Sequence, residues 1–140
     1  MGKINPARVF LGGIVGGIVI NILAPLMHDV LLKNEHAAAM AALNKTMPAG
    51  GSTIAVWVIY GFVWAIAAVW LYAAIRPRFG PGAMTAVRAA LAAWFFGSFL
   101  MGIAMWNLTL MPLSPLELVL ELIASILAVL AGAAVYKEAA

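Results

Sequence analysis

The chain contains no cysteine, and only 9% of its 140 residues are charged. The absence of cysteine excludes disulfides, thiolate nucleophiles, cysteine-ligated zinc and iron–sulfur clusters. Acidic residues are scarce, with five Asp and Glu against eight Lys and Arg, and there are only two histidines. Because ionisable side chains are so few, each one that falls inside an apolar stretch becomes a candidate for function.

Most of the chain consists of long apolar stretches. Hydrophobic residues make up 66% of the chain and the mean hydropathy is +1.07. Four stretches, 9–32, 54–75, 83–110 and 116–136, each reach the roughly 20 residues that a helix needs to cross a bilayer. The sequence therefore predicts an all-α membrane protein: one membrane domain over residues 1–140, folded as an up-down-up-down bundle of four transmembrane helices.

Basic residues are distributed unevenly between the two sides of this topology. The positive-inside rule places the richer side in the cytoplasm, which predicts that both termini are cytoplasmic. On the opposite, outer side, the alanine-rich segment 34–44 is predicted to form a short interfacial helix. The richer side has Lys3, Arg8, Arg76, Arg78, Arg88 and Lys137, and the outer side has Lys33 and Lys45. These residues form no basic patch, so nucleic-acid binding is not expected.

One segment carries a resemblance to known proteins. Residues 70–82 read WLYAAIRPRFGPG, the first apolar stretch is rich in glycine, and the C-terminus is short and charged. In these features the chain resembles small bacterial four-helix membrane proteins of unknown function. The resemblance extends over most of the chain and implies a location in the bacterial inner membrane. It implies no activity, cofactor or site residue.

Glycines of the first stretch are expected to set helix packing, because close contact between small residues drives helix association in lipid. The first stretch contains two overlapping GxxxG pairs. On one face we expect Gly13 and Gly17 to pack against Ala128 and Gly132 of the fourth stretch. The first and fourth helices should then be neighbours.

The same two faces predict a polar pocket at the outer end of the bundle. They continue to Asn21 and His28 on the first helix and to Glu117 and Glu121 on the fourth. Counted along each helix, His28 and Glu121 both lie roughly 6–9 Å below the outer boundary, and Asn107 lies near the same level. Such a pocket could bind a cation, relay protons or hold a polar headgroup.

Structural roles for these residues are equally open at this stage. Ser114 and Glu117 fit a capping box at the start of the fourth helix, and His28 could simply satisfy a neighbouring carboxylate. No metal site is predicted, since one intramembrane histidine and two carboxylates have no recognised ligand spacing. Haem would need a second buried histidine, and copper would need more clustered Met and His. No cofactor is assigned.

Two functions follow from these features. The first is a small integral membrane subunit or binding protein that packs through Gly- and Ala-rich faces against a larger membrane complex, itself as a homo-oligomer, or lipid. The small residues of the second and third helices favour it, because they exceed what one four-helix core is expected to use. The alternative is a small proton- or cation-coupled transporter or channel that uses the periplasm-facing pocket. Catalysis is not predicted, because no nucleophile with its base and no metal ligand set is recognisable.

Overall fold

The computed structural model describes residues 3–46 and 50–139, which are almost entirely helical. Four helices are long and apolar enough to cross a membrane, which confirms an all-α bundle with four spans. The short helix predicted in the first outer loop is also present. The elements are α1 (Pro6–Pro25), η1 (Leu26–Leu31), α2 (Lys33–Ala42), α3 (Gly51–Phe79), α4 (Ala83–Trp94), η2 (Phe95–Phe99), α5 (Leu100–Asn107) and α6 (Pro115–Val135).

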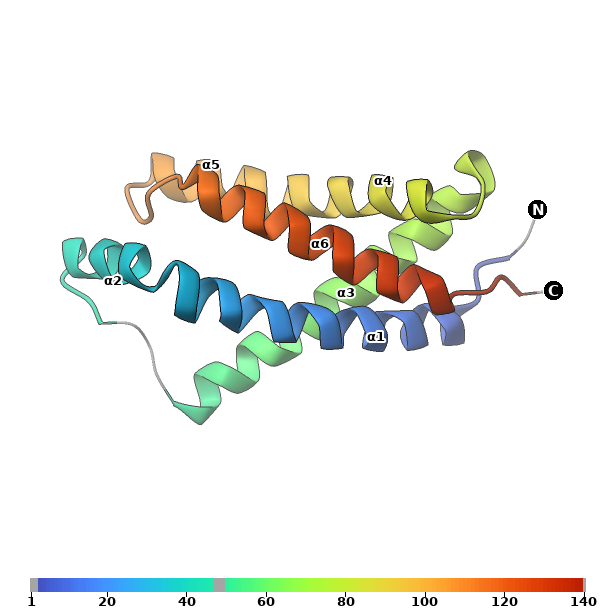
Figure 1. Ribbon diagram of the computed structural model, residues 1–140, viewed down its shortest axis with the longest axis horizontal. Helices are drawn as coiled ribbons and strands as arrows, with labels where there is room; N and C mark the ends of the chain where they lie inside the picture. The colour runs from blue at the N-terminus through green and yellow to red at the C-terminus, as the bar shows by residue number, and fades with distance from the viewer. Residues whose placement is uncertain (1–2, 47–49, 140) are drawn as a thin grey trace.

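The spans alternate in direction and form a ring of neighbours. Helix α1 packs against α3 and α6, and α4 packs against α3 and α6. The chain ends lie together at one end of the bundle, with the α3–α4 connection, whereas α2 and the α5–α6 connection lie at the other (Figure 1). We call the first the arginine end, for Arg76, Arg78 and Arg88, and the second the histidine end, for His28 and His36.

Two spans contain π-helical segments. In these, each backbone N–H bonds to the carbonyl five residues earlier, where an α-helix uses the carbonyl four residues earlier. Segment η1 continues the first span directly after Pro25, and η2 joins α4 to α5 in the third span. Proline removes a backbone donor inside a helix, and a local change in hydrogen-bonding pattern accommodates that loss. Single-turn π segments are rare and occur frequently at functional sites. Both lie toward the histidine end.

Helices α1 and α6 meet through glycine backbones. A Cβ added at Gly12 would lie 2.6 Å from the carbonyl oxygen of Gly132, and one added at Gly16 would lie 2.8 Å from that of Ala128. Only residues without side chains beyond a methyl group permit this approach. The expected neighbours are therefore in contact, through Ala128 and Gly132 as expected on α6 but through the other glycine pair on α1.

Gly13 and Gly17 pack on α3 and not on α6, which corrects the expected face. A Cβ at Gly13 would overlap Ile66, and one at Gly17 would overlap the ring of Phe62. Successive helical residues are about 100° apart, so Gly12 and Gly13 serve different neighbours. The overlapping GxxxG pairs thus make two interfaces from one helix.

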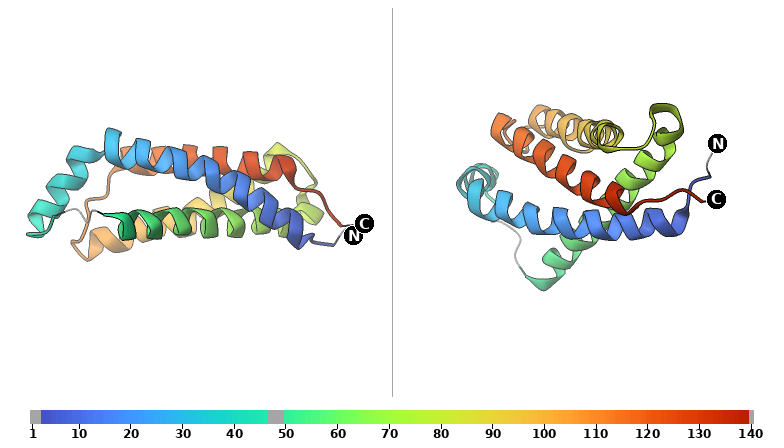
Figure 2. Two further views of the ribbon diagram at one scale, coloured as in Figure 1. Left: turned by 90° about the horizontal axis from the view of Figure 1, so that it is seen from below. Right: turned by 45° about the vertical axis from the view of Figure 1, so that its right-hand side comes forward.

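The small residues of the other spans are also used inside this single chain. Ala65, Ala68, Ala86 and Ala90 are each at most 2% exposed, and Gly61 lies against the Asn21 side chain. The surplus of small surface expected from the sequence is therefore absent at these positions. What is exposed instead is large and apolar: every residue from 54 to 60 is exposed, on first turns of α3 that diverge from the other spans (Figures 1 and 2).

The arginine end is closed by contacts between the two chain ends. Lys3 pairs with Ala139 in an isolated antiparallel bridge, and Arg76 forms an ion pair with Glu138 (Nη1–Oε1, 3.2 Å). Helix α3 continues past Pro77 to Phe79, further than the sequence predicted, because the turn itself begins only at Gly80, where φ is 81°, and ends at Gly82, where φ is 124°.

Candidate functional site at the histidine end

A sharp change of direction after the first span positions both histidines. Segment η1 carries His28, and its last turn leads into Leu32, which is only 1% exposed. Leu32 anchors the start of α2 on the bundle, and its carbonyl accepts the backbone hydrogen bond of His36 at 3.0 Å. The imidazole rings of His28 and His36 are consequently stacked, with centroids 5.2 Å apart.

The start of α6 supplies the carboxylate. Ser114 is the N-cap, and its hydroxyl accepts a hydrogen bond from the backbone N–H of Glu117 at 3.3 Å. Of the capping box predicted from the sequence, the half made by the Ser114 side chain is therefore present. The Glu117 side chain, however, is turned toward the two imidazoles, so the residue contributes to the cap through its backbone and to the site through its carboxylate.

Three side chains from three different elements converge here. Glu117 Oε1 lies 3.1 Å from His36 Nε2 and 3.7 Å from His28 Nδ1. One ligand atom from each residue can be chosen so that all three lie within 4.8 Å of one another. The His36 side chain is 9% exposed, that of Glu117 22% and that of His28 34%. We call these three side chains the His–Glu–His cluster. Its His36 side is shielded from solvent by the protein, and its His28 side is accessible to solvent.

These distances are close to those of a first coordination shell. With bonds of about 2.0–2.2 Å, the ligands of a tetrahedral zinc ion lie roughly 3.3–3.6 Å apart. Two of the three cluster distances fall within a few tenths of an ångström of that range. Two imidazoles and one carboxylate also form a ligand set that zinc uses when its fourth position is left open. A Glu–His hydrogen bond satisfies the same groups without an ion.

Glu121 lies one helical turn along α6 from Glu117 and is not a member of the cluster. It is partly buried, and its carboxylate lies close to the Ser98 side chain of η2. The two π-helical segments therefore each bring a polar side chain to an acidic residue of α6, His28 to Glu117 and Ser98 to Glu121. The expected direct meeting of His28 with Glu121 is replaced by these two contacts.

The two asparagines expected in the pocket lie elsewhere. The Asn21 amide donates hydrogen bonds to the carbonyls of Gly17 (2.8 Å) and Val58 (3.2 Å), so it ties α1 to α3. Asn107 ends α5 and is exposed. The predicted pocket is thus reduced to His28 and Glu117, with Glu121 one turn away.

Sequence reasoning missed His36, which is the most buried member of the cluster. The residue falls in the predicted interfacial helix, to which no site residue was assigned. Two features could have indicated its role: it is the only other histidine of the chain, and it lies eight residues from His28 across a short connection.

Comparison with known proteins assigns no relative. No family model matches the chain, and neither a curated protein nor a solved structure matches it. The resemblance noted for segment 70–82 is therefore supported only in its general part: four long apolar helices indicate a small four-span membrane protein. Function has to be argued from the site alone.

Proposed function

We propose that this protein is a small integral membrane binding protein whose His–Glu–His cluster takes a divalent transition-metal ion of the zinc type. The observation that carries the proposal is the convergence of His28, His36 and Glu117 from η1, α2 and α6, with one ligand atom of each within 4.8 Å of the others. Imidazole with carboxylate suits zinc and related first-row ions, whereas magnesium and calcium prefer oxygen ligands alone.

An ion would also resolve the electrostatics of the cluster. A carboxylate placed in an apolar bundle end needs a partner, because an uncompensated charge there is costly. Neutral imidazoles compensate it only through hydrogen bonds, whereas a divalent cation would neutralise Glu117 and occupy the free lone pairs of both rings. The exposed edge of His28 gives the ion a route in.

Zinc titration of the wild-type protein tests this proposal. In dodecyl maltoside, protein that carries no histidine tag should bind one Zn²⁺ per chain, and Mg²⁺ at the same concentration should not compete. Co²⁺ in the same site should give the strong visible absorption of low-coordinate cobalt. Absence of saturable zinc binding, or displacement of zinc by Mg²⁺, would reject the proposal.

Cation transfer, the alternative drawn from the sequence, has one supporting observation. Glu121 lies beside Ser98, one turn from the cluster, where a cation or proton leaving Glu117 would next find a carboxylate. Against it, the α1–α6 interface has no room for an added methyl group at Gly12. Zinc-driven flux in proteoliposomes that is lost in Glu121→Gln, with zinc binding retained, would favour transfer over binding.

Association with a second copy or a larger complex is a further proposal from the sequence, and it loses its main support. Most of the small residues that were to make such contacts, among them Ala65, Ala68, Ala86 and Ala90, are buried in the bundle of one chain. We therefore restrict the proposal to ion binding, and we consider membrane lipid as the neighbour of the exposed apolar surface.

Orientation is proposed on charge alone: the arginine end faces the cytoplasm of a bacterial inner membrane and the histidine end faces the periplasm. Because the chain has no cysteine, single cysteines can be placed by Ser52→Cys and Phe79→Cys. An impermeant thiol reagent added to intact bacterial cells should label the first and not the second. Labelling of position 79 alone would reverse the orientation, and labelling of both would show two topologies.

A further inference from the structure

Helix α2 has few features of its own that would keep it folded. Of its ten residues, all within the described part of the chain, His36 alone is buried, and Met40 is the one large apolar side chain. Its N-terminus has no side-chain cap. Helices shorter than about 12–15 residues are marginal in water even when they are rich in alanine. The helical form of α2 therefore depends on its contacts with the rest of the protein.

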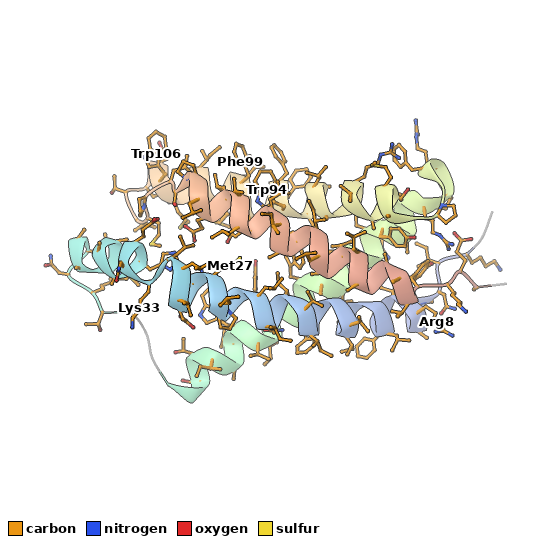
Figure 3. All side chains as sticks on the ribbon, viewed as in Figure 1. Arg8, Met27, Lys33, Trp94, Phe99 and Trp106 are labelled. Carbon is orange, nitrogen blue, oxygen red and sulfur yellow. The ribbon has the colours of Figure 1, made fainter. Side chains whose placement is uncertain are left out.

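The surroundings of α2 supply few such contacts. The helix follows η1 directly, with Lys33 at the turn between them (Figure 3). On the side of the α5–α6 connection, a groove of about 360 Å³ separates α2 from Trp106 and Leu110. Most residues of α2 other than His36 are exposed. The position of the helix thus depends mainly on its buried histidine.

His36 joins α2 to two other elements. Its Nε2 lies 3.1 Å from Glu117 Oε1 on α6, and its ring stacks on His28 of η1 with centroids 5.2 Å apart. The backbone leaves the α-helical conformation on both sides of α2, at Leu32 (φ −106°, ψ 8°) and at Asn44 (φ 54°). Rotation at these two points would move α2 without moving a span.

We propose that α2 is a lid whose folding onto the bundle is controlled by the metal ion in the His–Glu–His cluster. The inference rests on the proposed metal binding and adds the conformational response to it. Without an ion, one hydrogen bond and one ring stack hold α2, and the helix opens about Leu32. With an ion, ligands from η1, α2 and α6 are bonded to one centre, so α2 stays folded and closed. Closing of the lid and retention of the ion therefore favour each other equally.

Hydrogen exchange of the wild-type protein in dodecyl maltoside tests this inference, because amides of a locally unfolding segment exchange when that segment opens. An ion that binds only the closed state lowers the open fraction in proportion to its concentration over its dissociation constant. At free Zn²⁺ of about 100 times that constant, the α2 amides should exchange about 100-fold more slowly than in EDTA. Amides in the middle of α6 should change far less, because the spans are folded in both states.

Two variants on α6 test the contact of His36 with Glu117 without altering the sequence of α2. In metal-free protein, Glu117→Ala removes the hydrogen-bond partner of His36 and should speed α2 exchange roughly two- to tenfold, the effect of one hydrogen bond. In the presence of Zn²⁺ it should also lose most of the slowing. Glu121→Ala makes the same change one turn further along α6, outside the cluster, and should leave α2 exchange as in the wild type.

Three results would overturn the inference, and they can be told apart. Zinc binding with equal α2 exchange in the presence and absence of the ion would reject the lid and leave the proposed function standing. Equal α2 exchange in metal-free wild type and Glu117→Ala would show that other contacts hold the helix. Failure to bind zinc would reject both this inference and the proposed function.

Discussion

His36→Ala is expected to abolish tight zinc binding while leaving the four-span bundle folded. Loss of a partner behind a metal ligand typically lowers affinity by roughly 10–100-fold, and loss of a direct ligand should cost at least the upper part of that range. The bundle should survive because α2 is also anchored through Leu32, and because His36 lies outside the contacts between spans. Competition with a chromophoric chelator measures the affinity, and circular dichroism the helix content.

Glu35→Ala is the matched control for this variant. Glu35 precedes His36 on α2, is exposed, and can also contribute charge near the histidine end. If zinc were held by general attraction to acidic side chains, Glu35→Ala would weaken binding and His36→Ala would not. The cluster requires the opposite result, and unchanged zinc affinity in His36→Ala would contradict it.

The spans were predictable from the sequence because hydropathy alone determines them. A helix that crosses lipid must satisfy its backbone internally and must be apolar over its whole length, so the signal is long and hard to miss. The differences at the ends have local causes. Helix α3 runs past Pro77 and ends at the glycine that follows Phe79. The third span contains η2, and no residue pattern in the sequence predicted this π-helical segment.

Helix rotation was less predictable than helix position. The overlapping GxxxG pairs of α1 indicated two small faces, but the sequence does not say which neighbour each face meets. The rotation is settled by packing of the whole bundle, which places Gly12 and Gly16 against α6 and leaves Gly13 and Gly17 for α3. A stripe of small residues therefore predicts close contact better than it predicts the partner.

The site was found in part because its members depend on different levels of structure. His28 was identified from its depth within the first apolar helix and Glu117 from its place on the polar face of the fourth, both properties of the sequence. The approach of His36 depends on η1 and on the burial of Leu32, which redirect the chain after the first span. Asn21 was misplaced for the same reason as the glycines, because its side chain faces α3 and binds the Val58 carbonyl.

Gly12→Ala is expected to lower the stability of the bundle by about 1–3 kcal/mol, the usual cost of overpacking a well-packed core. The added methyl group would lie 2.6 Å from the Gly132 carbonyl oxygen and 2.9 Å from a Val69 methyl group. The first of these contacts is with backbone, so no side-chain rotation relieves it and α1 must move away from α6. Unfolding in mixed micelles with increasing sodium dodecyl sulfate measures the loss, with tryptophan fluorescence as the signal.

Gly97→Ala makes the same chemical change at a position where the space allows it. Its added Cβ would lie 3.4 Å from Trp64 Nε1, which is ordinary contact with a side chain. The roughly 1 kcal/mol of α-helix propensity that alanine has over glycine applies in full to Gly12 in α1, where it opposes the expected loss, whereas Gly97 lies in the π-helical segment η2. Gly97→Ala should be neutral or slightly stabilising. Equal stability of the two variants would show that α1 and α6 are not in backbone contact at Gly12, and the ring of helix neighbours described above would then need a different order.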